Sequence, residues 1–357
     1  MRLLFISKRR PQGRDLVTRP YGRFVHLPLE LLRLGHEVRV TCIGLRAGPE
    51  SETTYLGLPI QAINLLPSPW HGLRKLQREC REWQPDWIIG GSDIYPGLLA
   101  SHLASFSGAK VALDAYDDFE SYAPWAVPAH WLWRRALARC DLASAAGPQL
   151  LQKMTIHAQR AVAAVVPMAA DPEFSPSSKR LARQVLNLPK NALLFGYTGS
   201  LDTKRGGQLL LDAWRQVAKR DPAARLVLCG RNRISDPNLP GVIHLGYVDD
   251  EHMPAVQRSL DAAIVLGSNS AFSQFSYPSK LCEAIACGTP VVATATGPIQ
   301  WMTSASSVQL VPIGDEGGLA EALTRITSAP DQREAGQQPC WAESARALAQ
   351  AMDSIFT

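Results

Sequence analysis

The segment Tyr277–Thr294, YPSKLCEAIACGTPVVAT, holds the residues best placed to do chemistry. Its Pro-Ser opening predicts a helix that begins just before Lys280 and ends at Gly288. The first turn of a helix presents unbonded backbone N–H groups and the positive end of the helix dipole, which suit a diphosphate. Ser279 opens this turn, and Glu283, one turn further, could accept hydrogen bonds from ribose hydroxyls. The alternative is a buried helix with an unrelated surface glutamate.

The stretch Arg14–Arg23, RDLVTRPYGR, follows the first apolar run of the chain. Gly22 would let the backbone approach a phosphate closely, and Arg19 and Arg23 add positive charge. The stretch is not a GxGxxG motif, so ordinary solvated surface is the competing interpretation.

The stretch Asp114–Tyr122, DAYDDFESY, places carboxylates after another apolar run. Asp117 or Asp118 could hydrogen-bond a donor or acceptor hydroxyl. The same residues would also serve as a helix N-cap, with Glu120 in the first turn of that helix. Both interpretations remain open from the sequence.

Apolar runs alternate with amphipathic stretches, which predicts parallel sheets with helices on both faces. The predicted strands are Leu3–Ile6, Val38–Ile43, Trp87–Ile89, Val111–Leu113 and Ala161–Val166 in one half, and Leu193–Tyr197, Leu226–Cys229, Val242–Leu245, Ala262–Leu266, Val291–Thr294 and Val308–Val311 in the other. Each half is large enough for a Rossmann-like domain. Three prolines in Val166–Pro176 place the boundary there.

The composition is that of a globular protein with sizeable cores: of 357 residues, 46% are hydrophobic and 19% are charged. We expect no signal peptide, because only four apolar residues precede Lys8, and no apolar run reaches the length of a spanning helix. Seven scattered cysteines without CxxC pairs indicate a reducing, cytoplasmic setting and neither a zinc site nor a disulfide framework.

Positive charge is concentrated in residues 1–160, which hold 20 Lys/Arg against 14 Asp/Glu, a net charge of 20 − 14 = +6. Such a surface attracts anionic partners. Trp125, Trp131 and Trp133 lie beside Arg134, Arg135 and Arg139, a pattern that suits a helix at the inner, anionic face of a membrane. Core packing of these tryptophans is the alternative.

Three segments in register resemble the retaining GT-B glycosyltransferases of family 4. Tyr277–Thr294 is similar to the nucleotide-sugar motif that ends EAxACGTPVVAT, in which the glutamate binds the ribose. Val166–Pro176 is similar to the interdomain phrase IPNGVDxxxFxP. Phe195–Trp214, FGYTGSLDTKRGGQLLLDAW, is similar to GRLxxxKGxxxLLxA at the start of the C-terminal domain.

The chain departs from the family pattern at the donor site. Phe275 stands where the family has the first of two glutamates, so that sugar contact is either lost or made by backbone groups. The residues assigned to the donor sugar are Phe275, Ser276 and Asp117. Ser200 replaces the usual arginine, and no histidine follows the fifth strand. The resemblance therefore assigns catalysis and diphosphate binding to the remaining polar and glycine positions: Arg205, Lys280 and Asp118 as catalytic residues, and Glu283, Ser279, Gly22, Gly199, Lys204 and Arg231 as donor ligands.

The resemblance implies an α/β fold of GT-B architecture, with two Rossmann-like domains facing each other across a cleft. Residues 1–168 would bind the acceptor, residues 169–340 would bind the donor, and residues 341–357 would form a helix packing back across the domains.

The implied reaction is a retaining, metal-independent transfer of a hexosyl group from a UDP or GDP sugar, without a bound cofactor. The acceptor would be a glycan, a lipid-linked sugar or a small molecule, and the pathway would be bacterial cell-surface polysaccharide synthesis. We expect no nucleic-acid partner. An inactive nucleotide-binding partner subunit and a nucleotide-sugar epimerase are the alternatives.

Overall fold

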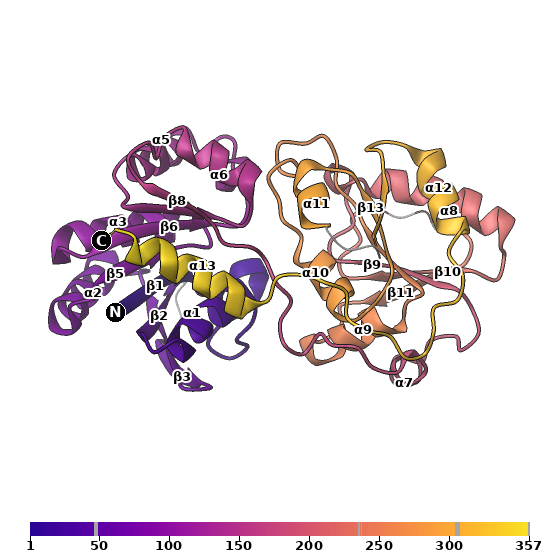
Figure 1. The fold of residues 1–357 in the computed structure, drawn as a ribbon, viewed down its shortest axis with the longest axis horizontal. Coiled ribbons are helices and arrows are strands. Elements are labelled where there is room, and N and C mark those ends of the chain that lie inside the picture. Colours follow the sequence, from indigo (N-terminus) through magenta and orange to yellow (C-terminus); the bar gives the residue numbers. More distant parts are fainter. Residues whose placement is uncertain (46–48, 235, 237, 304–307, 356–357) are drawn as a thin grey trace. The chain divides into compact units, whose positions relative to one another are not determined.

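The computed structural model describes residues 1–45, 49–234, 236, 238–303 and 308–355. These form two compact units (Figure 1): Met1–Ala169 together with Pro339–Thr357, and Ala170–Gln338. Each unit is built on one sheet whose strands are almost all parallel. The two parallel-dominant α/β sheets confirm the predicted fold class.

The first unit holds an eight-stranded sheet in the order β3-β4-β2-β1-β5-β6-β7-β8. Its strands are β1 (Arg2–Lys8), β2 (Glu37–Gly44), β3 (Ser51–Tyr55), β4 (Leu58–Asn64), β5 (Trp87–Gly90), β6 (Lys110–Ala115), β7 (Leu142–Ala145) and β8 (Val162–Val165). Its helices are η1 (Pro11–Gly13), α1 (Arg23–Arg33), α2 (Pro69–Trp83), α3 (Ile94–Ser107), α4 (Phe119–Tyr122), α5 (Val127–Leu137), α6 (Pro148–Thr155) and α13 (Trp341–Asp353).

Three of these strands are absent from the sequence prediction. β3 and β4 form an antiparallel hairpin through the two-residue turn Leu56-Gly57, where both residues have positive φ. β3 alternates half-buried with exposed residues, so it lacks the continuous apolar run by which the other strands were recognised. β7 is the short run LASA, whose small residues have weak strand propensity but are all buried.

The second unit holds a six-stranded parallel sheet in the order β11-β10-β9-β12-β13-β14. Its strands are β9 (Leu194–Thr198), β10 (Arg225–Cys229), β11 (Val242–Gly246), β12 (Ala262–Val265), β13 (Val291–Thr294) and β14 (Val308–Val311). Its helices are α7 (Lys179–Val185), η2 (Thr203–Arg205), α8 (Gly207–Arg220), η3 (Asp250–His252), α9 (Met253–Ser259), α10 (Ser279–Ala286), α11 (Gly297–Met302) and α12 (Glu316–Thr324). All six strands agree with the sequence prediction to within a residue or so.

Alternate residues of the second sheet enter two separate cores. Phe195 and Tyr197 of β9 point to the face covered by α8 and α12, where Trp214 is fully buried. Leu194 points to the opposite face, against Leu281 of α10. Helices on both faces leave the carboxyl edge of the sheet as the place where loops can meet a ligand.

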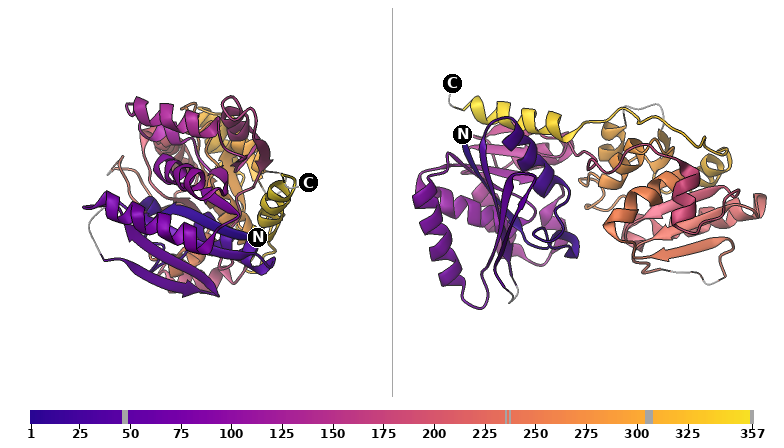
Figure 2. Two further views of the ribbon diagram at one scale, coloured as in Figure 1. Left: turned by 90° about the vertical axis from the view of Figure 1, so that its left-hand side faces the viewer. Right: turned by 90° about the horizontal axis from the view of Figure 1, so that it is seen from below.

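The last helix, α13, belongs to the first unit, where it packs on α1 and β8 (Figures 1 and 2). Trp341 is buried and stacks on the ring of His26, with the centroids 6.4 Å apart. The Ser344 hydroxyl donates a 2.9 Å hydrogen bond to the carbonyl of Pro167. Phe356 and Thr357, which the predicted C-terminal helix includes, lie outside the described residues.

Candidate functional site at the carboxyl edge of the second sheet

The chain order of the second sheet reverses between β9 and β12, so their carboxyl ends flank a switch point. Gly199 follows β9 with φ +109°, and its N–H donates a 2.8 Å bond to the carbonyl of Cys229. Gly230, after β10, has φ +115°, and a Cβ there would come 2.5 Å from the Gly199 carbonyl oxygen. Only glycine fits both positions, and the result is a bare backbone loop at the strand ends.

Lys280 stands over this loop from the first turn of α10. Its Nζ lies 4.1 Å from the centroid of the Tyr197 ring and 3.5 Å from where a Cβ of Gly199 would stand. The described residues place no carboxylate within ion-pair distance of Lys280. α10 begins at Ser279, after Pro278, so Lys280 belongs to its first turn, at the positive end of the helix dipole. The start of α10 and the Lys280 ammonium together form an electropositive site.

Arg205 lies on the same β9–α8 loop but is held by its neighbours. Its Nη1 donates a 2.7 Å bond to Asp202, and its guanidinium lies 5.2 Å from the centroid of the Phe272 ring. The side chain of Lys204 lies outside the described part of the chain. Arg205 therefore has to exchange its bond to Asp202 if it is to reach a diphosphate.

Glu283 lies one turn inside α10 and is half-buried. Burial raises the pKa of the Cys229 thiol to about 11, and the nearby Glu283 carboxylate contributes to the rise. Glu283 therefore lies close enough to the end of β10 for its charge to act on the Cys229 thiol. Arg231, which follows the glycine loop, has an exposed side chain, and its carbonyl accepts a 3.0 Å bond from Leu201 N–H.

Sequence reasoning missed a cluster of hydroxyls in the loop after β12. Ser270 lies at hydrogen-bond distance from both Ser268 (3.0 Å) and Ser273 (3.2 Å). Phe275 and Ser276, the predicted donor-sugar residues, follow in the same loop and are half-buried. A run of small polar residues, GSNSAFS, directly after a buried strand was the available signal.

Gly22, Asp117 and Asp118 belong to the first unit, as do Arg19 and Arg23, whereas the other predicted site residues belong to the second. Gly22 is the N-cap of α1 with φ +63°, and a Cβ there would meet nothing within 4 Å. Asp118 is buried and bonds Lys153 at 2.7 Å, and although it occupies the N-cap position of α4 it makes no capping hydrogen bond. Asp117 accepts a 2.5 Å bond from the Tyr122 hydroxyl.

The assignment of Arg23 to a phosphate is wrong. Arg23 is buried, and its guanidinium donates to both oxygens of Asp114 and to the carbonyls of Val166 and Pro167. All of these partners are internal, so the side chain holds the fold together and does not face a ligand.

The tryptophans of residues 125–139 lie partly on the surface and partly in the core of the first unit. Trp125 and Trp131 are 80% and 58% exposed, and the Arg135 guanidinium lies over the Trp131 ring. Trp133 is buried against Phe119, with the ring centroids 5.6 Å apart. None of the helices within the described ranges is long and apolar enough to span a membrane.

The comparisons with known proteins cover the part of the chain that carries this site. Residues 192–329, which contain the glycine loop and α10, match the family model Glycosyl transferases group 1. Over the whole chain, the structure is similar to a sucrose-phosphate synthase of Thermosynechococcus elongatus, with a TM-score of 0.69, 18% identity and coverage of 100% of this chain and 95% of that one. The chain has the GT-B fold. This confirms the fold that the resemblance implies, and the match to the group 1 family model lies within the second unit.

Two further GT-B structures cover the chain similarly. Anabaena HepE in complex with UDP gives a TM-score of 0.67 at 16% identity over 99% of this chain and 97% of that one. WaaG, a glycosyltransferase involved in lipopolysaccharide biosynthesis, gives 0.63 at 15% identity over 99% and 98%. At these identities the likeness concerns the fold.

Curated relatives of this GT-B chain match over less than half their length. The D-inositol 3-phosphate glycosyltransferase of Saccharomonospora viridis is 29% identical over 194 residues, which are 48% of this chain and 43% of the relative. That of Actinosynnema mirum is 30% identical over 191 residues, 48% and 45% of the two chains.

Proposed function

We propose that this protein transfers a hexosyl group from a nucleoside diphosphate sugar to an acceptor hydroxyl, with retention of configuration at the anomeric carbon. The observation that carries the proposal is the position of Lys280, a residue of the first turn of α10, whose Nζ lies 3.5 Å from the Cβ position of Gly199. Both residues lie within the segment that matches the glycosyltransferase family model. Glycine loop, cation and helix end together suit a diphosphate. The similar HepE has been crystallised with UDP and with UDP-glucose, which supports a donor of this class.

In this mechanism the donor diphosphate is the leaving group. The bond from the anomeric carbon to the diphosphate oxygen breaks, and the acceptor oxygen bonds to the same face of that carbon while its proton passes to the departing diphosphate oxygen. Lys280 and the N–H groups at Ser279 would stabilise the charge that develops on the departing diphosphate. Glu283 would bind the ribose, and Arg205 would add a second cation after leaving Asp202. No protein nucleophile is required.

Metal independence belongs to the same proposal, because protein cations and a helix end take the place of a divalent ion at the diphosphate. Transfer should therefore persist in EDTA. Complete loss in EDTA that magnesium or manganese restores would contradict this account.

The first unit would bind the acceptor, which we place among glycans, lipid-linked sugars and small molecules of bacterial surface polysaccharide synthesis. A cytoplasmic site of action, with peripheral contact to the inner membrane face, completes the proposal. The cytoplasmic setting is supported by the scattered cysteines without CxxC pairs, and the membrane contact by the exposed Trp125 and Trp131.

A panel of UDP and GDP sugars, followed by release of UDP or GDP, tests the proposal. One donor should be consumed, and Lys280→Met should slow its turnover at least tenfold, whereas Lys219→Met, on the exposed face of α8, should not. An interconverted sugar without nucleotide release would indicate an epimerase. Tight nucleotide binding without turnover of any donor would indicate an inactive partner subunit. Three features favour this alternative: Phe275, Ser200 and the bond of Arg205 to Asp202.

A further inference from the structure

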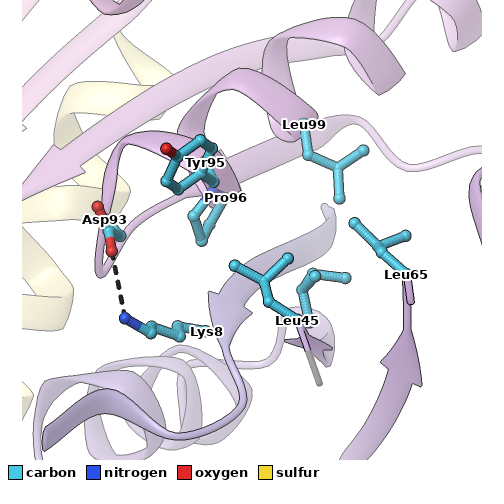
Figure 3. A pocket seen from close by; sticks show the side chains of 8 residues that line it. Lys8, Leu45, Leu65, Asp93, Tyr95, Pro96 and Leu99 are labelled. Atoms are coloured by element: carbon cyan, nitrogen blue, oxygen red, sulfur yellow. Dashed lines mark hydrogen bonds and ion pairs between the residues drawn. The ribbon is translucent and has the colours of Figure 1, made fainter. Parts of the chain in front are cut away.

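An apolar groove runs along the first unit, outside the residues assigned to donor binding. One part lies between the ends of β1, β2 and β4 and the start of α3 (Figure 3), and the other lies between the starts of α2 and α3. The two parts share the lining residues Leu65 and Leu99, so they adjoin each other, and the inner part offers about 20 Å³ of space. In Figure 3 the Lys8–Asp93 pair marks one end, and Leu65 and Leu99 lie toward the other.

The outer part of the groove is lined by apolar side chains alone among the described residues: Leu65, Pro69, Trp70, Leu73 and Leu99. It offers about 230 Å³ of space, more than the roughly 150 Å³ of an apolar cavity that takes up benzene. A sugar or a nucleotide would lose hydrogen bonds to water there without gaining others. The lining therefore suits a hydrocarbon chain.

Large side chains beside the groove are unusually exposed. Trp70 is 73% exposed and Tyr95 is 54% exposed. Both lie where a helix begins, Trp70 in α2 and Tyr95 in α3, so they stand at the carboxyl edge of the sheet. A chain lying in the groove would cover this apolar area, which is the ordinary driving force for binding a hydrocarbon.

The inner end of the groove is charged. Lys8 closes β1, and its Nζ lies 3.4 Å from Asp93 Oδ2 while the side chain remains 41% exposed. Asp93 caps the start of α3, because its other oxygen accepts a 2.7 Å hydrogen bond from the Ile94 N–H. The ammonium keeps further donors for an anion. This end also lies where the strand order reverses between β1 and β5, the usual ligand position in such sheets.

We propose that the groove binds the hydrocarbon chain of an amphiphilic acceptor, with its anionic group at Lys8 and its tail passing Leu65 and Leu99 toward Trp70. The net charge of +6 in residues 1–160 favours an anionic amphiphile over a neutral or cationic one. That this ligand is the acceptor rests on the proposed function. Of the three acceptor classes given there, a groove for a hydrocarbon chain selects the lipid-linked one.

The test is calorimetric titration of the full chain with butyl, hexyl and octyl phosphate, each kept below the concentration at which it forms micelles. Affinity should rise about threefold to fourfold per added methylene until the groove is filled. Trp70→Ala, at an exposed position that folding does not require, and Leu99→Gln should flatten this dependence. Leu34→Gln, at an exposed leucine away from the groove, should preserve it, and Lys8→Gln should weaken all three ligands by a similar factor.

Equal affinity for butyl and octyl phosphate, or an unchanged chain-length dependence in Trp70→Ala, would overturn the proposal. Titration with UDP and GDP on the same samples reports separately on the second unit. A steep chain-length dependence in a protein that binds neither nucleotide would support the groove and defeat the proposed function, so the two failures are distinguishable.

Discussion

Arg23 donates two hydrogen bonds of 2.7 Å to Asp114, one from Nε and one from Nη2, in a buried bidentate pair. The same guanidinium donates to the carbonyl of Val166 at 2.8 Å, and the Ser144 hydroxyl donates to Asp114 at 2.6 Å. The pair thus joins the start of α1, the end of β6, β7 and the segment that leaves β8. Gly22 directly precedes Arg23, and Asp117 follows the end of β6, so the ion pair positions the proposed acceptor side of the first unit.

Replacing Asp114 by Ala should destabilise the first unit by about 3–5 kcal/mol, because Arg23 would remain buried without its counter-charge. Ser144→Ala should cost less, about 1.5–3 kcal/mol, the scale of one hydrogen bond to a charged group. Urea unfolding followed by circular dichroism measures both. A loss for Asp114→Ala no larger than that for Ser144→Ala would show that the pair does not hold the unit together.

A second buried carboxylate makes the second unit sensitive to acid. Burial alone would raise the pKa of Asp261, but bonds from the Leu194 N–H and Lys179, with the charge of Arg183, hold it below its ordinary value. A carboxyl with a lowered pKa in the folded state contributes stability above about pH 4, and this contribution disappears as the pH falls further.

Asp261→Asn should therefore lower the unfolding free energy at pH 7, by about 3–5 kcal/mol, and should flatten its decline between about pH 5 and pH 2. Asp236→Asn, at the surface ion pair with Arg215, serves as the control and should change little. Unfolding curves at several pH values give both quantities. A parallel decline in the Asp261 variant and the wild type would contradict the assignment.

Glu283→Ala should weaken binding of the preferred nucleoside diphosphate by about 1.5–3 kcal/mol, the scale of a hydrogen bond to a charged group. Glu321→Ala, on the exposed side of α12, is the matched control. Isothermal titration with UDP and GDP measures the effect, and comparison with the 2′-deoxy nucleotide tests the ribose contact. Unchanged affinity would remove Glu283 from the ribose site.

Sedimentation with anionic vesicles should decline as salt rises toward physiological ionic strength, where the Debye length is roughly 8 Å. Trp125→Ser with Trp131→Ser should reduce it, because both rings are exposed, and so should Arg134→Glu with Arg135→Glu. The exposed Tyr247 of the second unit supplies the control, Tyr247→Ser. Failure to sediment even at low salt would point to a water-soluble acceptor.

Most of the architecture could be predicted because parallel strands buried on both faces appear as continuous apolar runs. Of the three strands that escaped prediction, two lack such a run: β7 is built from small residues, and β3 is an edge strand with exposed positions. These two cases depend on their neighbours in the sheet more than on their own residues.

The positions of site residues that depend on helix and strand boundaries could be predicted from the sequence. The ion-pair partners of individual side chains could not. The start of α10 follows from Pro278 and Ser279, and with it the position of Lys280. Nothing in the sequence distinguishes Arg23, whose partner lies 91 positions away, from an exposed arginine. Arg205 was likewise expected at a phosphate, whereas Asp202, three positions earlier, holds it.

The return of α13 to the first unit makes that unit discontinuous in the chain. Its hydrophobic surface around α1 and β8 stays uncovered until residues 341–353 leave the ribosome, after the whole second unit has been synthesised. The second unit, by contrast, is one uninterrupted segment and can complete its folding first. During synthesis, therefore, the unit that begins the chain is the last to be finished.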